Sequence, residues 1–398
     1  MKRRSRLSKL FFPGVALVPG NHLRLLQSGV EFFPALLAAI DAAQTEIHLE
    51  TYIFHADASG VLVRDALIRA GQRGVRVLLL LDGVGSSDLP MEWIKVLKDA
   101  GVSVLIYRPP HTGWLTNPLN LRRLHRKVAV IDARVALIGG MNIIDDFVPV
   151  AYPVPRLDYS VEVRGPLIAH IHRNVHRLWR LVALSQLQPG LDEELVAEPT
   201  WPTDGHARAA FVVRDNIRHR RDIERVYLAA LALAQQDIFI ASAYFLPGQR
   251  FRRILKAAAE RGVRVRLLVQ GRTDHPFFLT AARALYGDLF AAGIEIHEYH
   301  ASEHHAKAAV IDGHWVTVGS SNIDPFSLLL AREAIVVSED REFARQLQQR
   351  LEYAIEQGAV KLDGADWQRR AWPARALSWL AYGGVRLMLG VVGFRRWV

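Results

Sequence analysis

The chain contains two copies of one pattern, and this duplication constrains the fold more than any other feature. Residues 36–84 read as a helix, a strand that ends at Tyr52, a second helix and a strand opened by RGVRV. Residues 228–271 repeat that order, with Tyr244 as the strand-end aromatic and the same pentapeptide. Its glycine is suited to a helix end, and the aliphatic run beyond it to a buried strand. The alternation predicts an α/β fold, and two copies predict two similar α/β domains.

The repeat extends into a second block in each copy. HRKVAVIDARVALIGGMN (125–142) matches HAKAAVIDGHWVTVGSSN (305–322). The preceding tyrosine lies 18 positions before the histidine in the first copy and 6 in the second, so the first copy carries a 12-residue insertion. A chain of 398 residues is long for a single core. We predict one domain at 1–190, a second at 205–365, and an amphipathic tail at 370–398.

Each copy of the block carries H-x-K-x-x-x-x-D followed by G-x-x-N at the same offset. On a strand, the histidine and the lysine two positions later share one face. The aspartate falls at an expected hairpin turn, and the return strand brings the asparagine back beside the histidine. One such strand would be interpreted as a surface strand, but two at identical offsets indicate a shared site. Its candidate residues are His125, Lys127, Asp132, Asn142, His305, Lys307, Asp312 and Asn322.

Two copies of this set suit the chemistry of a phosphodiester. One neutral imidazole can attack phosphorus while the other, protonated, donates to the leaving alkoxide. Lysines and asparagines stabilise charge on the non-bridging oxygens, which is the role of a metal in other phosphoryl-transfer sites. The sequence therefore predicts a covalent phosphohistidine that a second alcohol or water releases, without a cofactor or a metal. The chain has no cysteine, which excludes disulfides and thiolate chemistry.

These motifs resemble those of the phospholipase D superfamily. Within it, the chain resembles the bacterial cardiolipin synthases that lack N-terminal transmembrane helices. Besides the motifs, the similarity rests on LETYIFHAD (49–57), DYSVEVRGP (158–166), SAYFLP (242–247) and GSSNIDPFSLLLAREA (319–334), and it covers nearly the whole chain. The resemblance implies two phospholipase D-type α/β domains with one active site at their pseudo-twofold interface.

The resemblance also implies a role for each residue of the motifs. His125 is the expected nucleophile and His305 the expected acid, while Asp132 and Asp312 orient and tune the histidines. Lys127, Lys307, Asn142 and Asn322 bind phosphate, and Glu333 is a histidine partner at the substrate site. The chain departs from the common family pattern at four positions that bear on acceptor specificity: Gly140, Phe326, Ala331 and Ile335.

The activity implied by the resemblance is phosphatidyl transfer from one phosphatidylglycerol to another, giving cardiolipin and glycerol. Phosphatidylethanolamine stays open as a co-substrate, and so does the oligomeric state. A phospholipase D-type phosphodiesterase, acting on lipid or nucleic acid, is the alternative enzyme. A non-catalytic membrane-binding protein is a third possibility, but it would need neither histidine.

Charge and the C-terminal segment favour a lipid surface. The net charge of +10 suits anionic phospholipids, although nucleic acid would be equally compatible with it. The segment 372–398 is apolar and rich in tryptophan, but Arg375, Arg386 and Arg395 divide it into stretches too short to span a bilayer. We predict a helix that lies in the membrane interface, with a terminal helix packed on the enzyme as the alternative. The expected location is peripheral, on the inner cell membrane, with anionic phospholipids and no nucleic acid as partners.

Three histidines, His170, His172 and His176, lie close together in HIHRNVHRLWRL. The last two have helical i, i+4 spacing, which metal sites use. No companion carboxylate motif accompanies them. We therefore interpret them as the basic face of an amphipathic helix.

Overall fold

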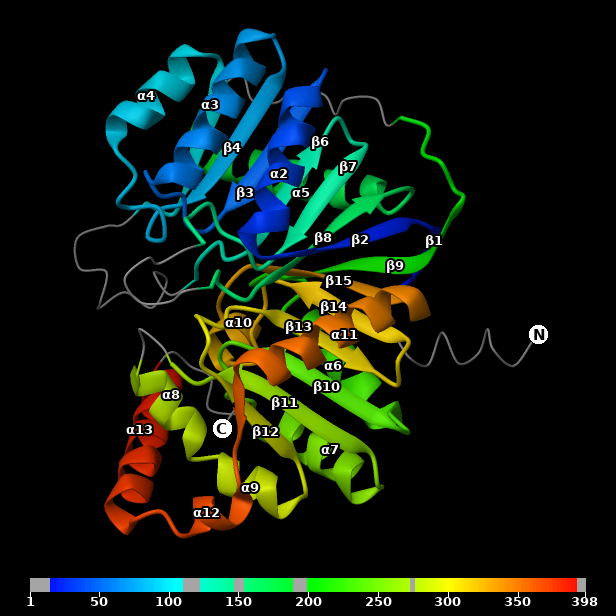
Figure 1. The fold of residues 1–398 in the computed structure, drawn as a ribbon. Helices are drawn as coiled ribbons and strands as arrows, with labels where there is room; N and C mark the ends of the chain where they lie inside the picture. Colours follow the sequence, from blue (N-terminus) through cyan, green and yellow to red (C-terminus); the bar gives the residue numbers. More distant parts are fainter. Residues whose placement is uncertain (1–14, 110–121, 147–153, 189–198, 273–275, 392–398) are drawn as a thin grey trace.

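The computed structural model describes residues 15–109, 122–146, 154–188, 199–272 and 276–391 (Figure 1). Most of the 12-residue insertion, much of the expected linker and Arg395 lie outside these ranges. The described chain forms two halves, one above the other in Figure 1, that share a similar order of helices and strands, with additional helices in the second half.

The first half is built on a seven-stranded sheet in the order β2-β8-β7-β6-β3-β4-β5. Its strands are β2 (His22–Gln27), β3 (Glu46–Thr51), β4 (Arg76–Asp82), β5 (Val102–Tyr107), β6 (Lys127–Ile131), β7 (Val135–Gly139) and β8 (Tyr159–Arg164). Its helices are α2 (Ser28–Ala42), α3 (Ala58–Gln72), α4 (Met91–Asp99) and α5 (Ile168–Ser185).

The second half is built on a nine-stranded sheet in the order β1-β9-β15-β14-β13-β10-β11-β12-β16. Its strands are β1 (Val18–Gly20), β9 (Gly205–Arg214), β10 (Asp237–Ser242), β11 (Arg264–Gln270), β12 (Glu295–Tyr299), β13 (Lys307–Ile311), β14 (Trp315–Gly319), β15 (Glu333–Glu339) and β16 (Ala359–Lys361). Its helices are α6 (Asp222–Leu233), α7 (Gln249–Glu260), α8 (Pro276–Arg283), α9 (Tyr286–Ala291), α10 (Pro325–Leu329), α11 (Arg341–Gly358), α12 (Gly364–Gln368) and α13 (Trp372–Val391).

Strand pairing confirms the duplication. In the first half, β3 runs parallel to β4 and antiparallel to β6, and in the second half β10 pairs with β11 and β13 in the same way. By strand register, Glu50 of the first half is equivalent to Ala241 of the second, so the counterpart of Tyr52 is Ala243. The expected equivalence of Tyr52 and Tyr244 is therefore wrong by one residue.

The turns form where the sequence predicts them. Gly74 and Gly262, the glycines of the two pentapeptides, follow helices α3 and α7 with φ of +82° and +89°. Glycine reaches this left-handed region without a Cβ clash. The β6–β7 and β13–β14 hairpins turn at Asp132 and Asp312, also at positive φ.

The two sheets face each other across a shared apolar core. One cluster combines Val161 and Val175 of the first half with Val316, Val336 and others of the second. Helices α2, α3 and α4 cover the outer face of the first sheet, and α6 and α7 that of the second (Figure 1). The halves are also linked through the backbone, because β1 belongs to the second sheet although it precedes the first half.

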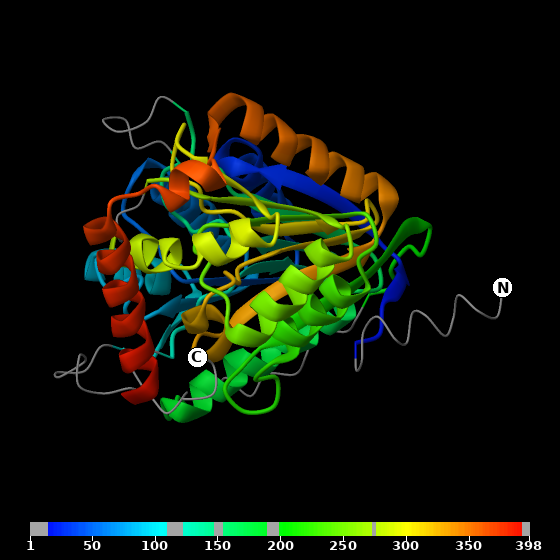
Figure 2. The same ribbon diagram turned by 90° about the horizontal axis from the view of Figure 1, so that it is seen from below.

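The C-terminal helix α13 packs against α8 at one edge of the molecule (Figure 2). Its buried face joins the core of the second half through Ala381, Tyr382, Val385 and Leu389. No helix among the described residues is both long and apolar enough to cross a membrane.

Candidate active site

The two motifs meet at the interface of the halves, where each motif is bonded to the backbone of the other half. His125 lies just before β6, and its N–H donates to the carbonyl of Arg332 at 2.9 Å. His305 lies just before β13, and its N–H donates to the carbonyl of Leu157 at 2.8 Å. The positions of the two histidines therefore depend on the docking of the halves.

Each imidazole is bonded by a carboxylate from the opposite half. His125 Nδ1 lies 2.9 Å from Glu333 Oε1, at the start of β15. His305 Nδ1 lies 2.7 Å from Asp158 Oδ2, immediately before β8. Both carboxylates are fully buried. A carboxylate that accepts a hydrogen bond from Nδ1–H fixes the tautomer of the neutral imidazole, in which Nε2 carries the lone pair.

Asp158 was not among the candidate residues, although the duplication contains the signal for it. Gly139 pairs with Ser160 across β7 and β8, and Gly319 pairs with Ile335 across β14 and β15. This register makes Asp158 the counterpart of Glu333 in the first half. The sequence block DYSVEVRGP therefore contributes a functional carboxylate.

The two lysines are buried beside the histidines. Lys127 Nζ donates to the carbonyl of His125 at 2.7 Å, and Lys307 Nζ makes the same bond to His305. Burial lowers the pKa of Lys127 to about 7 and that of Lys307 to about 8, because the charged form loses its hydration. Tyr52 covers this side, with its ring centroid 4.9 Å from that of His125 and 5.2 Å from Lys127 Nζ.

Burial sets the ionisation of the histidine pairs as well. It lowers the pKa of His125, and it lowers that of His305 well below its ordinary value, where Lys307 and Lys127 add to the effect. Burial raises the pKa of Asp158 to about 7. An empty site of this kind favours neutral imidazoles. A bound phosphodiester anion would raise the pKa of both histidines and both lysines, because opposite charge stabilises their protonated forms.

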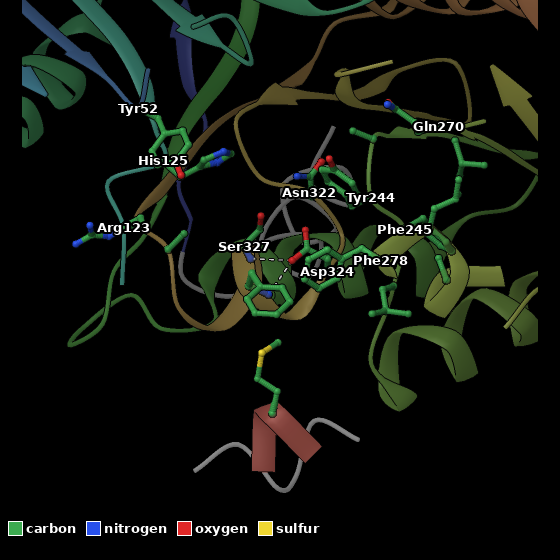
Figure 3. A pocket seen from close by; sticks show the side chains of 18 of the residues that line it. Tyr52, Arg123, His125, Tyr244, Phe245, Gln270, Phe278, Asn322, Asp324 and Ser327 are labelled. Atoms are coloured by element: carbon green, nitrogen blue, oxygen red, sulfur yellow. Dashed lines mark hydrogen bonds between the residues drawn. The ribbon is translucent and has the colours of Figure 1, made fainter. Parts of the chain in front are cut away.

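The asparagines occupy matching positions after β7 and β14. Asn142 Oδ1 accepts a hydrogen bond from the N–H of Ile53 at 3.2 Å. Asn322 lines a cavity of about 430 Å³ that begins at His125 and Tyr52 and continues into the second half (Figure 3). Deeper in the cavity, the walls are mainly aromatic and aliphatic, including Phe245, Phe278, Leu279, Phe326 and Met388.

The expected orienting role of Asp132 and Asp312 is wrong. Each lies at the opposite end of its strand from the histidine, in the β-hairpin turn. Asp132 accepts hydrogen bonds from the backbone N–H groups that start β3, and Asp312 does the same for β10. Strands rise about 3.3 Å per residue, so five residues of strand separate these carboxylates from the histidines they were expected to orient.

The interpretation of the three nearby histidines as a basic face is also wrong for two of them. His170 is exposed, but His172 and His176 are buried against β3. A companion carboxylate does exist, because Glu46 Oε1 lies 2.6 Å from His172 Nε2. Sequence spacing could not reveal it, since Glu46 lies 126 positions away on a strand.

The duplicated fold with paired HxKxxxxD motifs is that of a phospholipase D-type phosphotransferase. Comparison with known proteins gives the family. The family model described as "Cardiolipin synthase, PLD-like domain" matches residues 36–179 and 227–355. The chain belongs to the cardiolipin synthase family with phospholipase D-like domains.

The relatives share nearly the full length of the chain. Cardiolipin synthase B of Shigella flexneri is 40% identical over 377 residues, covering 94% of this chain and 90% of the relative, and that of Escherichia coli (strain K12) gives the same values. Among solved structures, the phosphatidylserine synthase of Haemophilus influenzae Rd KW20 superposes with a TM-score of 0.68 at 14% identity, over 99% of this chain and 100% of that one. This structural match supports the fold alone.

Replacing Asp132 with alanine should reduce stability rather than chemistry. The variant loses the acceptor for three backbone N–H groups and for the hydroxyl of Thr45. We expect the free energy of unfolding to fall by about 2 kcal/mol and kcat of the folded enzyme to stay within about threefold. Denaturant unfolding and kcat measure the two effects, with Asp132→Asn as a milder control. A loss of about 100-fold or more in kcat at unchanged stability would contradict the structural role.

Replacing Lys127 with methionine should stabilise the protein while abolishing its activity. In the unfolded chain this lysine has its ordinary pKa of 10.5, whereas its pKa in the folded protein is about 7. The unfolded chain therefore binds more protons between these pH values, and the folded state is penalised progressively as pH falls from about 10.5 to 7. We expect a gain of about 1–3 kcal/mol at pH 7 that shrinks towards pH 10.

Thermal unfolding as a function of pH tests this expectation. Lys95→Met, at an exposed position of α4, is the matched control and should show no such pH-dependent gain. A Lys127→Met variant that is less stable than the native chain at pH 7 would disprove the electrostatic penalty.

Proposed function

We propose that the enzyme transfers a phosphatidyl group from one phosphatidylglycerol to another, giving cardiolipin and glycerol. The observation that carries this proposal is a pair of histidines, each bonded by a carboxylate of the opposite half, of which His125 lines a mainly apolar cavity. The histidines suit phosphodiester exchange, and the apolar walls suit a lipid acyl chain. The names of the relatives agree with this activity.

In the first step, Nε2 of His125 attacks the phosphorus of the donor lipid. The P–N bond forms as the bond between phosphorus and the glycerol headgroup oxygen breaks, and protonated His305 gives its proton to that oxygen. Glu333 holds His125 through Nδ1 and stabilises the positive charge that develops on its ring.

In the second step, His305 acts as a base. It takes the proton from a headgroup hydroxyl of the second phosphatidylglycerol, whose oxygen attacks phosphorus and releases His125. Asp158 supports the proton exchange of His305 from the Nδ1 side. Each histidine reverses its own role between the steps: His125 is first the nucleophile and then the leaving group, and His305 is first the acid and then the base.

Lys127, Lys307, Asn142 and Asn322 would bind the non-bridging oxygens of the phosphate. The lysine side chains are at most 4% exposed. Charges in such a water-poor site stabilise a transition state more strongly than charges in water. These side chains would therefore offset the charge of the phosphate in the transition state.

The cavity suits one acyl chain of a bound lipid. Its volume of about 430 Å³ lies within the range of small-molecule pockets, and its deep walls offer few hydrogen-bond partners. Most of the lining residues come from the second half, including Phe245 and Phe278 (Figure 3), and Met388 of α13 is one of them. A nuclease would need polar or stacking contacts to successive nucleotides instead.

Helix α13 is placed to hold the enzyme at a membrane surface. One face packs on the second half, so the packed-helix alternative is correct for that face. The opposite face exposes large apolar side chains, with Arg375 and Arg386 on the same helix: Trp372, Leu377, Trp379, Leu380 and Leu387. Exposed tryptophan and leucine beside arginine are typical of helices that lie in the interface of an anionic bilayer. Peripheral attachment through α13 would bring lipid to the cavity that Met388 lines.

Lipid mass spectrometry tests the reaction. Membranes of a cardiolipin-deficient host should contain cardiolipin when the host expresses the native chain, and about 1,000-fold less or none with His125→Ala, because the nucleophile is removed. His170→Ala, at an exposed position of α5, should match the native chain. Phosphatidic acid in place of cardiolipin would show a hydrolase on the same fold and would overturn the synthase proposal.

Vesicle binding tests the role of α13. Leu380→Asp should weaken binding to vesicles containing phosphatidylglycerol by about tenfold or more, because it replaces apolar contact with a charge repelled by the anionic surface. Met91→Asp, at an exposed position of α4 in the other half, is the control. Equal binding by both variants in a flotation assay would rule out α13 as the docking surface.

A further inference from the structure

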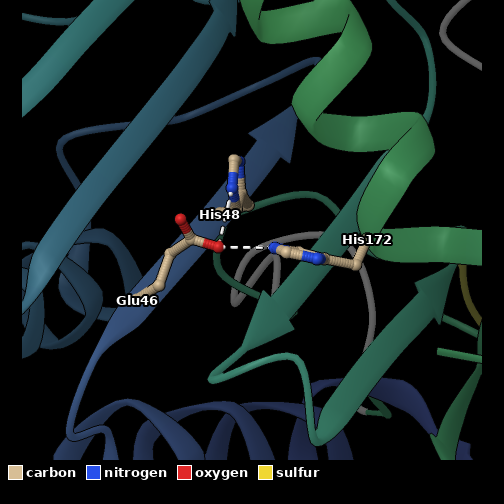
Figure 4. A group of neighbouring side chains, drawn as sticks. All are labelled: Glu46, His48 and His172. Carbon is tan, nitrogen blue, oxygen red and sulfur yellow. Dashed lines mark hydrogen bonds and ion pairs between the residues drawn. The ribbon is translucent and has the colours of Figure 1, made fainter. Parts of the chain in front are cut away.

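A second cluster of chemically active side chains lies away from the catalytic histidines, between β3 and α5. Glu46 and His48 are two positions apart on one face of β3, and His172 reaches them from α5 (Figure 4). All three side chains are at most 2% exposed. Neither step of the transfer reaction uses this cluster.

The side chains converge on a common point. Nε2 of His172 lies 2.6 Å from Glu46 Oε1, and Nε2 of His48 lies 3.0 Å from the same oxygen. The second contact lacks hydrogen-bond geometry, and His48 Nε2 is buried without a hydrogen-bond partner. The three ligand atoms lie within 4.8 Å of one another. In tetrahedral zinc sites, ligand atoms bonded at about 2.0–2.1 Å lie about 3.3 Å apart, so a small outward adjustment would accommodate an ion.

The surroundings complete the features of a metal site. Arg76 pairs with the other carboxylate oxygen of Glu46, which fixes the carboxylate and leaves Oε1 directed at the histidines. Carboxylates that bind metals are commonly held in this way by an outer partner. His176, one turn along α5, has its ring centroid 5.9 Å from that of His48.

The other half of the chain provides an internal comparison. By strand register, His48 corresponds to Phe239 and Glu50 to Ala241. Phe239 and Ala241 belong to the apolar cluster that includes Leu347 of α11. The fold therefore does not require histidines at this depth. Buried imidazoles and a carboxylate cost desolvation energy that a bound cation would offset.

We propose that Glu46, His48 and His172 bind a divalent transition-metal ion of the zinc class. Two imidazoles and one carboxylate are ligands that suit Zn²⁺, whereas Mg²⁺ and Ca²⁺ prefer oxygen. The ion joins β3 to α5 and has a structural role. Arg126, between the first catalytic histidine and lysine, pairs with Glu50 on the same face of β3 and donates to Asn174 of α5. The metal thus braces the wall behind the first motif.

Metal content and metal binding test this proposal without reference to lipid chemistry. The full chain, produced in zinc-supplemented medium, should contain about one zinc ion per chain by elemental mass spectrometry. After removal of metal by chelation, Zn²⁺ at about 100 times its Kd should raise Tm by about 5 °C. Co²⁺ in place of Zn²⁺ should give visible absorption bands from its imidazole and carboxylate ligands.

Matched variants assign the site. His172→Ala and Glu46→Gln should lose the bound zinc and the rise in Tm, whereas His170→Ala, exposed on the same helix, should keep both. A native chain that contains no zinc and shows no rise in Tm overturns the proposal even if the variants fail to fold. Equal zinc responses in His172→Ala and His170→Ala would also overturn it. Cardiolipin formation is scored separately, so loss of the metal and failure of the transferase can be told apart.

Discussion

The rest of the site depends on two hydrogen bonds between the halves, in each of which a carboxylate of one half holds the catalytic histidine of the other. Glu333 from the second half holds His125 of the first, and Asp158 from the first half holds His305 of the second. Neither half can orient its own histidine. The sheets pack face to face through an apolar cluster, and this packing sets the positions of both imidazoles, because an error in the docking would misplace both at once.

The sequence was sufficient to predict the two-domain α/β fold, the meeting of the motifs and the positions of the turns. Periodicity and the glycines of RGVRV specify local structure, and the duplication implies symmetry. The sequence was insufficient to predict contacts between segments that are distant along the chain. Asp158 has no motif of its own and becomes visible only through strand register, and the glutamate beside His172 lies on another element. The aspartates of the motif were assigned to the histidines because they share a repeat, whereas the extended strand keeps them apart.

Divergence between the halves shows which features the fold needs and which it does not. Both halves keep the histidine, the lysine, the asparagine and the turn aspartate. The mainly apolar cavity, by contrast, takes most of its lining from the second half, and the buried histidine cluster lies in the first. A symmetric scaffold can tolerate such specialisation because the shared site uses one strand end from each half. The regions behind the two strand ends are then free to differ.

The electrostatics of the site explain why stability and activity oppose each other here. Two lysines and two histidines are gathered in a space from which water is largely removed, and burial lowers the pKa of each. Without substrate, burial disfavours the protonated forms of these side chains, so charging them costs free energy that a bound phosphate anion would offset. The same cost provides selectivity for an anion, because a neutral ligand would leave it unrelieved. A site assembled from apolar side chains would fold more stably but would have no means of holding a phosphoryl group in transfer.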